Sequence, residues 1–112
     1  MSAPLSSTHF RNVKNTAVNL SNGLIDVTSL LVVNTTAAAI FVQFFNLAAA
    51  DVVVGTTRPV FSIPVAATTG FEVVYFGPNG TIFDTRLSAA ATTTVEGSTD
   101  PGDGVFVQIF IT

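Results

Sequence analysis

Apolar residues are densest over residues 39–47, which read A-I-F-V-Q-F-F-N-L. The side chains of a β-strand alternate between two faces, so this segment, as a strand, divides into two sets. One face carries Ile40, Val42, Phe44 and Asn46, and the other carries Phe41, Gln43 and Phe45. A strand at the rim of a small monomeric sheet has a polar outer face. The pattern therefore predicts a strand covered by the chain's own core on one side and by something else on the other.

The C-terminal residues 105–112 repeat this pattern. Phe106, Gln108 and Phe110 fall on one face of the expected strand, and the other face carries Val105, Val107, Ile109 and Ile111. The motif F-x-Q-x-F therefore occurs twice, far apart in the chain. One interpretation is that the two strands are neighbours, with Gln43 and Gln108 close enough to bond each other or the same partner. The other is coincidence in a chain rich in phenylalanine.

Shorter alternating or β-branched stretches predict further strands. They lie at residues 13–20, 24–27, 28–34, 58–64, 71–76, 81–85 and 88–95. Prolines bracket the segment 58–64 and cannot donate to a central ladder, so it is expected at a sheet edge or with its prolines just outside the pairing. The turn sequence G-P-N-G at 77–80 predicts that residues 71–85 form a hairpin.

The other segments complete an all-β chain. Residues 1–12 are rich in Ser, Thr and Pro and predict an N-terminal arm, and residues 47–57 predict a loop with a short extended piece. Residues 13–112 then form one domain, a single β-sandwich of about seven to nine short antiparallel strands. A jelly-roll or other Greek-key path is expected.

The low content of charged residues predicts a surface that is covered by partners. Only 10% of the 112 residues are charged, against about 25% in an ordinary domain, and the net charge is −3. A free monomer so poor in charge risks association. With four Lys and Arg residues in all, phosphate binding has no electrostatic basis, so a nucleic-acid partner is not expected. No run approaches the roughly 20 apolar residues of a membrane span, so no membrane partner is expected either.

Candidate chemistry is sparse, and no cofactor is expected. The single histidine, His9, lies in the predicted arm, where a catalytic base is rarely held rigidly against a nucleophile. Without cysteine or a second histidine, a zinc site is not expected. Glu96, Asp100 and Asp103 share the loop E-G-S-T-D-P-G-D-G, whose oxygens could hold a hard cation such as calcium. The same residues are those expected of a turn between strands, which is the preferred interpretation. No catalytic set emerges, and the chain is not expected to be an enzyme.

Residues 34–94 resemble a family of small structural proteins of tailed bacteriophages and prophages. The resemblance rests on F-V-Q-F-F-N at 41–46, P-V-F-S-I-P at 59–64 and F-G-P-N-G-T-I-F-D-T-R-L-S-A-A-A-T from residue 76. It departs at D-T-R, 84–86, where a small or glycine-rich connection is expected. The resemblance implies a virion protein of β-sandwich fold, a decoration (cement) protein that lies on the outer capsid as a homotrimer and contacts the major capsid protein.

On this interpretation the second apolar face packs against sister subunits. The expected subunit contacts are Phe41, Gln43, Phe45, Phe106, Gln108 and Phe110. The protein would reside in the virion, and in the host cytoplasm during assembly. Two alternatives stay open. One is a receptor- or carbohydrate-binding tip of a tail fibre or spike, which the absence of Trp and the single Tyr75 weaken. The other is a small enzyme or metal-dependent lectin that uses the loop 96–103.

Overall fold

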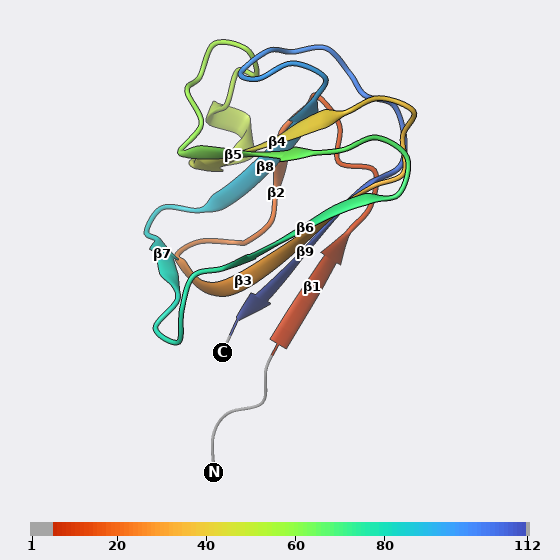
Figure 1. Ribbon diagram of the computed structural model, residues 1–112. Coiled ribbons are helices and arrows are strands. Elements are labelled where there is room, and N and C mark those ends of the chain that lie inside the picture. Colours follow the sequence, from red (N-terminus) through yellow and green to blue (C-terminus); the bar gives the residue numbers. More distant parts are fainter. Residues whose placement is uncertain (1–5, 112) are drawn as a thin grey trace.

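The computed structural model describes residues 6–111 and consists of two antiparallel sheets packed face to face (Figure 1). The first sheet has the order β1 (Ser6–Phe10), β9 (Val105–Ile111), β3 (Ile25–Asn34) and β6 (Gly70–Tyr75), with β7 (Thr81–Phe83) also paired to β3. The second has the order β2 (Val18–Asn19), β8 (Leu87–Thr92), β4 (Ile40–Asn46) and β5 (Phe61–Val65). The 3₁₀ turn η1 (Ala49–Asp51) is the one helical element in this range, which holds no helix suited to crossing a membrane.

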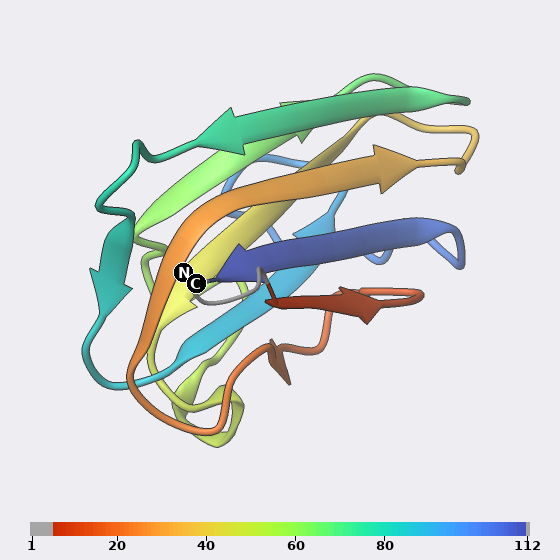
Figure 2. The same ribbon diagram turned by 90° about the horizontal axis from the view of Figure 1, so that it is seen from below.

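The strand order is that of a jelly roll. With the short β7 set aside, β1 pairs with β9, β2 with β8, β3 with β6 and β4 with β5. First and last strands pair, and the pairing proceeds inward to the β4–β5 connection. The chain is therefore one long antiparallel ribbon folded across itself, so that successive turns of the ribbon become the two sheets (Figures 1 and 2). The predicted all-β sandwich is confirmed.

The core follows the alternation of the strands. Ile40, Val42 and Phe44 of β4 point into it, and Val105, Val107 and Ile109 of β9 meet them from the other sheet. Three small or medium side chains of β8 complete this layer: Leu87, Ala89 and Ala91. Phe61 stacks on Phe44 with ring centroids 4.9 Å apart. The small alanines leave room for the aromatic rings between the sheets.

The two F-x-Q-x-F strands are not neighbours, so this prediction is wrong. β4 lies between β8 and β5 in one sheet, and β9 lies between β1 and β3 in the other. The two strands share the F-x-Q-x-F motif because each of them is apolar on both faces. Apolarity on both faces reflects what covers a strand and does not specify which strand pairs with it.

The predicted hairpin at residues 71–85 is also wrong. β6 and β7 do not pair with each other, because both pair with β3, at Asn34–Ser29 and Val27–Ile25 respectively. The G-P-N-G turn moves the chain along β3 without reversing it, and Phe76 N–H donates to Thr28 O just before it. Gly77 and Gly80 both adopt positive φ there, which glycine tolerates.

Other boundaries differ more modestly. Residues 6–10, expected within an arm, form β1 against β9, while residues 1–5 lie outside the described range. The two strands expected over 24–34 are one strand with a register shift between Val27 and Ser29. Of the strand expected at 13–20, Val18–Asn19 forms a strand, β2, paired with β8. The proline-bracketed segment does form an edge strand, β5.

Candidate interaction surface

The outer face of the first sheet is apolar across three of its strands. The register places Phe71 of β6 opposite Val33 of β3, and Val33 opposite Phe106 of β9. The next row on the same face is Val73, Leu31 and Gln108. The third row is Tyr75, Ser29 and Phe110. Antiparallel sheets usually have one face on the core and one polar face toward water, so this outer face is unusual.

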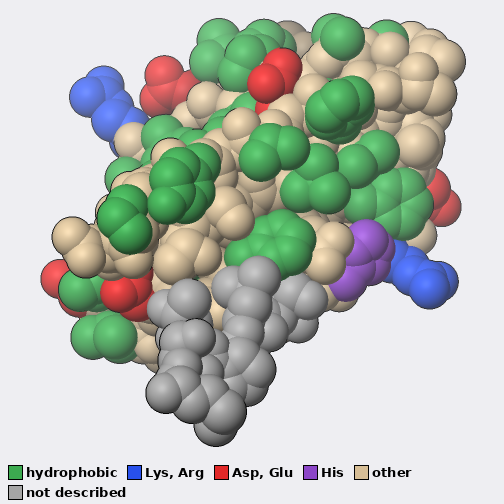
Figure 3. Space-filling model, turned by 60° about the horizontal axis from the view of Figure 1, so that its bottom comes forward, with side chains coloured by type: hydrophobic (Ala, Val, Ile, Leu, Met, Phe, Trp, Pro, Cys, Tyr) green, Lys and Arg blue, Asp and Glu red, His purple; other side chains and the backbone are tan. Residues whose placement is uncertain are grey.

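We call these outward apolar residues the apolar platform. It consists of Leu31, Val33, Phe71, Val73, Tyr75, Phe106 and Phe110. The β6 members are the most exposed, at 65% for Phe71, 62% for Val73 and 68% for Tyr75. Figure 3 shows this face, where hydrophobic side chains gather and charged side chains lie toward the margins. A contiguous exposed apolar surface of this kind marks a contact site.

Three of the expected contact residues belong to this surface. Phe106 and Phe110 are half-buried members of the platform, and Gln108 lies between them as its polar centre. Across the β1–β9 pair, Gln108 is opposite His9, whose ring lies 5.8 Å from that of Phe106. The structure therefore brings these three residues together on a surface that a partner can reach.

The other three expected contacts lie on β4 of the second sheet, and two of them are buried. Gln43 is 0% exposed and Phe45 is 1% exposed. Gln43 Nε2 donates to Thr92 Oγ1 at 2.9 Å and to Gly97 O at 3.1 Å. Only Phe41, next to Pro64 of β5, is partly exposed. A buried side chain cannot contact a second subunit while its cover stays in place, so Gln43 and Phe45 do not belong to the candidate surface.

Loops of the same chain supply that cover. The segments 47–60 and 93–99 lie over the outer side of β4 and β8, seen at the top of Figure 1. Ser88 Oγ donates to Leu47 O at 2.8 Å, and Val60 N–H donates to Phe44 O at 2.8 Å. The second apolar face of β4 is therefore covered within one chain, while that of β9 is not.

Sequence reasoning missed the β3 and β6 members of the platform. The run F-E-V-V-Y-F places Phe71, Val73 and Tyr75 on one face of a strand, and that alternation was visible. It was not visible that Leu31 and Val33 pair beside them, because pairing between distant strands leaves no local pattern.

The acidic loop is tied to the β1–β2 connection by charge. Lys14 Nζ lies 3.0 Å from Asp103 Oδ1 and 4.0 Å from Asp100 Oδ2. The hydrogen bond and charge of Asp103, with the charge of Asp100, raise the pKa of Lys14. Asp100 Oδ1 also accepts from Gly102 N–H at 3.0 Å, which is a turn contact. These contacts support the turn interpretation of the loop.

Within residues 6–111, no three His, Asp or Glu side chains gather as metal ligands. Glu96, the third acid of the loop, lies 4.0 Å from Arg58 Nε. No protein-family model and no curated protein matches this chain. The apolar platform is the candidate site that the geometry offers.

Proposed function

We propose that this protein is a structural subunit of a bacteriophage virion, a decoration protein that lies on the outer capsid as a homotrimer and contacts the major capsid protein. The observation that carries the proposal is the apolar platform. An exposed sheet face with Phe71, Val73 and Tyr75 each more than 60% accessible is costly to leave in water. Packing it against sister subunits removes that cost.

Three further observations support the proposal. The chain is only 10% charged, which suits a subunit whose surface is covered by partners. Jelly rolls occur in viral capsid domains, an analogy at the level of fold alone. The motifs in residues 34–94 resemble those of phage structural proteins. A small contact repeated at many symmetric capsid sites gains avidity, so each contact can be modest.

The test is the molar mass of the purified protein by light scattering during size exclusion, followed by co-sedimentation with capsids of the phage or prophage whose genome carries its gene. Val73→Ser, on the platform, and Val53→Ser, outside it, form a matched pair because the two valines are 62% and 61% exposed. We expect a trimer for the wild type and for Val53→Ser, and a shift toward monomer for Val73→Ser. A monomer at every wild-type concentration, with no capsid binding, would sink the proposal.

A second candidate is a receptor- or carbohydrate-binding tip module of a tail fibre or spike. The observation that favours it is the exposure of two aromatic rings on one sheet face, Phe71 at 65% and Tyr75 at 68%. Exposed aromatic faces can stack on apolar faces of sugar rings. Binding to a glycan array that Tyr75→Ala abolishes, by a monomeric protein, would place this function first.

A further inference from the structure

The four edges of the two sheets are not equally protected against pairing with another chain. A free edge presents unpaired N–H and C=O groups, and proteins blunt such edges with prolines, inward charges or very short strands. β5 carries Pro64 in mid-strand, β2 is two residues long, and β6 carries Glu72 on the side that faces the sandwich. β1 has none of these devices. Its sequence S-S-T-H-F holds no proline and no Lys, Arg, Asp or Glu, and its pairing with β9 has no bulge.

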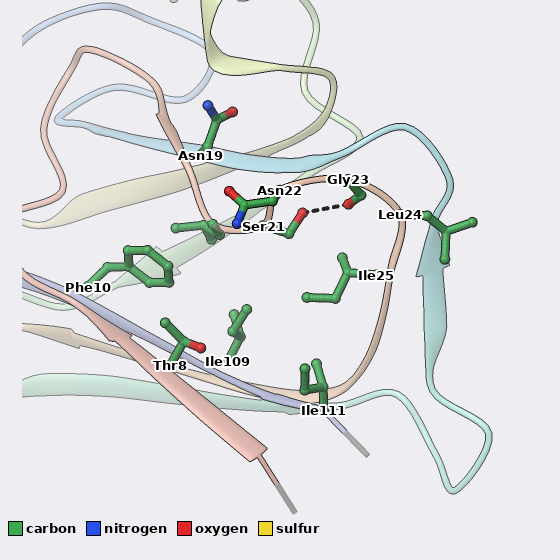
Figure 4. Close-up of a pocket in the computed structure, with 11 residues that line it drawn as sticks. Thr8, Phe10, Asn19, Ser21, Asn22, Gly23, Leu24, Ile25, Ile109 and Ile111 are labelled. Carbon is green, nitrogen blue, oxygen red and sulfur yellow. Dashed lines mark hydrogen bonds between the residues drawn. The ribbon is translucent and has the colours of Figure 1, made fainter.

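An uncharged hollow of about 660 Å³ adjoins this unprotected edge. Its floor is the inner side of β1 and β9, with Thr8, Phe10, Ile109 and Ile111 (Figure 4). Its other wall is the turn from Asn19 to Ile25, where Ser21 Oγ donates to Gly23 O at 2.8 Å. The hollow exists because β2 is too short to cover the inner side of β1. Every residue that lines it is uncharged.

From the edge and the hollow together we infer that this side of the sandwich receives an extended strand of another protein. A strand added beside β1 would lie about 4.8 Å from it and pair with the backbone groups on the edge that faces away from β9. Alternate side chains of the added strand then point to the same side as Thr8 and Phe10, which is into the hollow.

The hollow also defines the chemistry of that strand. Phe10, Ile25 and Ile111 offer apolar walls, so the inward positions of the strand are apolar. No charged side chain lines the hollow, and the Arg86 guanidinium at its rim is bonded to Asn22 O at 3.2 Å. Burying an unpaired charge there is costly. Asn22 at the rim can bond backbone or small polar groups. The partner segment is thus an uncharged stretch of five to seven residues, about the length of β1, with apolar residues at every second position.

This site is separate from the apolar platform. The platform lies on the outer side of the first sheet, whereas the hollow lies between the sheets beyond the edge of β1. His9 and Thr8 mark the division, because neighbouring residues of a strand point to opposite faces. The inference therefore stands whether or not the platform holds sister subunits.

The test uses the full chain and a displayed library of nine-residue peptides with Val, Ile, Leu or Phe at alternate positions. A control library has the same composition at helical spacing. Enriched peptides are measured by fluorescence anisotropy against the wild type, Thr8→Lys and His9→Lys. Thr8→Lys places a charge at the hollow, and His9→Lys places the same charge on the opposite face of the same strand. Thr8 and His9 are both exposed. Melting curves of the two variants serve as the control for folding.

We expect enrichment of strand-patterned peptides alone, and slower hydrogen exchange of the β1 amides when they bind. Thr8→Lys should weaken binding at least about tenfold, while His9→Lys should change it by less than about threefold. Equal enrichment from both libraries, no enrichment, or equal binding to Thr8→Lys would overturn the inference. So would protection of β1 in the free wild type that is lost on dilution, because a second copy of this chain would then occupy the edge.

Discussion

Gln43 and Gly97 are 54 positions apart in the chain, yet the side-chain amide of Gln43 donates to the Gly97 carbonyl at 3.1 Å. This bond fixes the 93–99 segment over the outer side of β4. The same amide reaches Thr92 Oγ1 at 2.9 Å, and Thr92 in turn donates to Thr94 O at 2.8 Å. One glutamine thus connects a sheet to the loop that covers it, and makes the second face of β4 part of the interior.

The two glutamines of the repeated motif should respond differently to truncation. Gln43→Ala removes two hydrogen bonds in a site that is 0% exposed and leaves a cavity, so we expect a loss of about 2 kcal/mol or more in the free energy of unfolding. Gln108→Ala, on the half-exposed outer face of β9, should cost less than about 0.5 kcal/mol. Urea denaturation at one protein concentration measures both. Equal losses would mean that Gln43 does not hold the loop.

The sequence predicts strands better than it predicts their partners. Continuous runs of apolar and aromatic residues located β4 and β9 to within about two residues, because such a run is a local pattern. The cover of β4 was not predictable, since loops 47–60 and 93–99 reach it through long-range contacts such as Gln43 to Gly97. The platform was half predictable. Phe106 and Phe110 followed from alternation, but their neighbours Leu31 and Val33 depended on pairing across the ribbon.

Gly80 should not tolerate a side chain. Its φ is +68°, and an added Cβ would collide with Asp26 Oδ1 and lie 2.9 Å from Val27 O. We therefore expect Gly80→Ala to cost about 2 kcal/mol or more in stability, from backbone strain and overpacking. Gly23→Ala is the control, because a Cβ added there would have no neighbour within 4 Å and the φ of Gly23 is not positive. That variant should change stability by no more than about 1 kcal/mol. Thermal denaturation of the two variants measures this difference. Equal melting temperatures for Gly80→Ala and Gly23→Ala would contradict the prediction.

The ion pair of Lys14 should make stability fall at alkaline pH. Asp103 and Asp100 raise the pKa of Lys14 above its ordinary 10.5 in the folded state. The contribution of a group with a raised folded pKa is complete below the unfolded pKa and is lost as pH rises through the folded one. The wild type should therefore lose more stability than Lys14→Met between about pH 9 and about pH 11.5. Urea midpoints at the two pH values give this difference, which added salt should reduce because the pair is exposed. If stability falls equally with pH in the wild type and in Lys14→Met, the ion pair of Lys14 does not contribute to stability.

Two phenylalanines of the expected contact set should separate folding from assembly. Phe45 is 1% exposed beneath the chain's own loops, so Phe45→Ser should lower the free energy of unfolding by about 3 kcal/mol or more. Phe106 is half-buried on the platform, so Phe106→Ser should cost about 1 kcal/mol in the isolated chain. Its main effect should be on molar mass, because it removes apolar area from the proposed subunit contact. Urea denaturation measures the stability of both variants, and light scattering measures their molar mass. If Phe45→Ser keeps wild-type stability but loses assembly, β4 is the contact strand, and the platform is not where sister subunits meet.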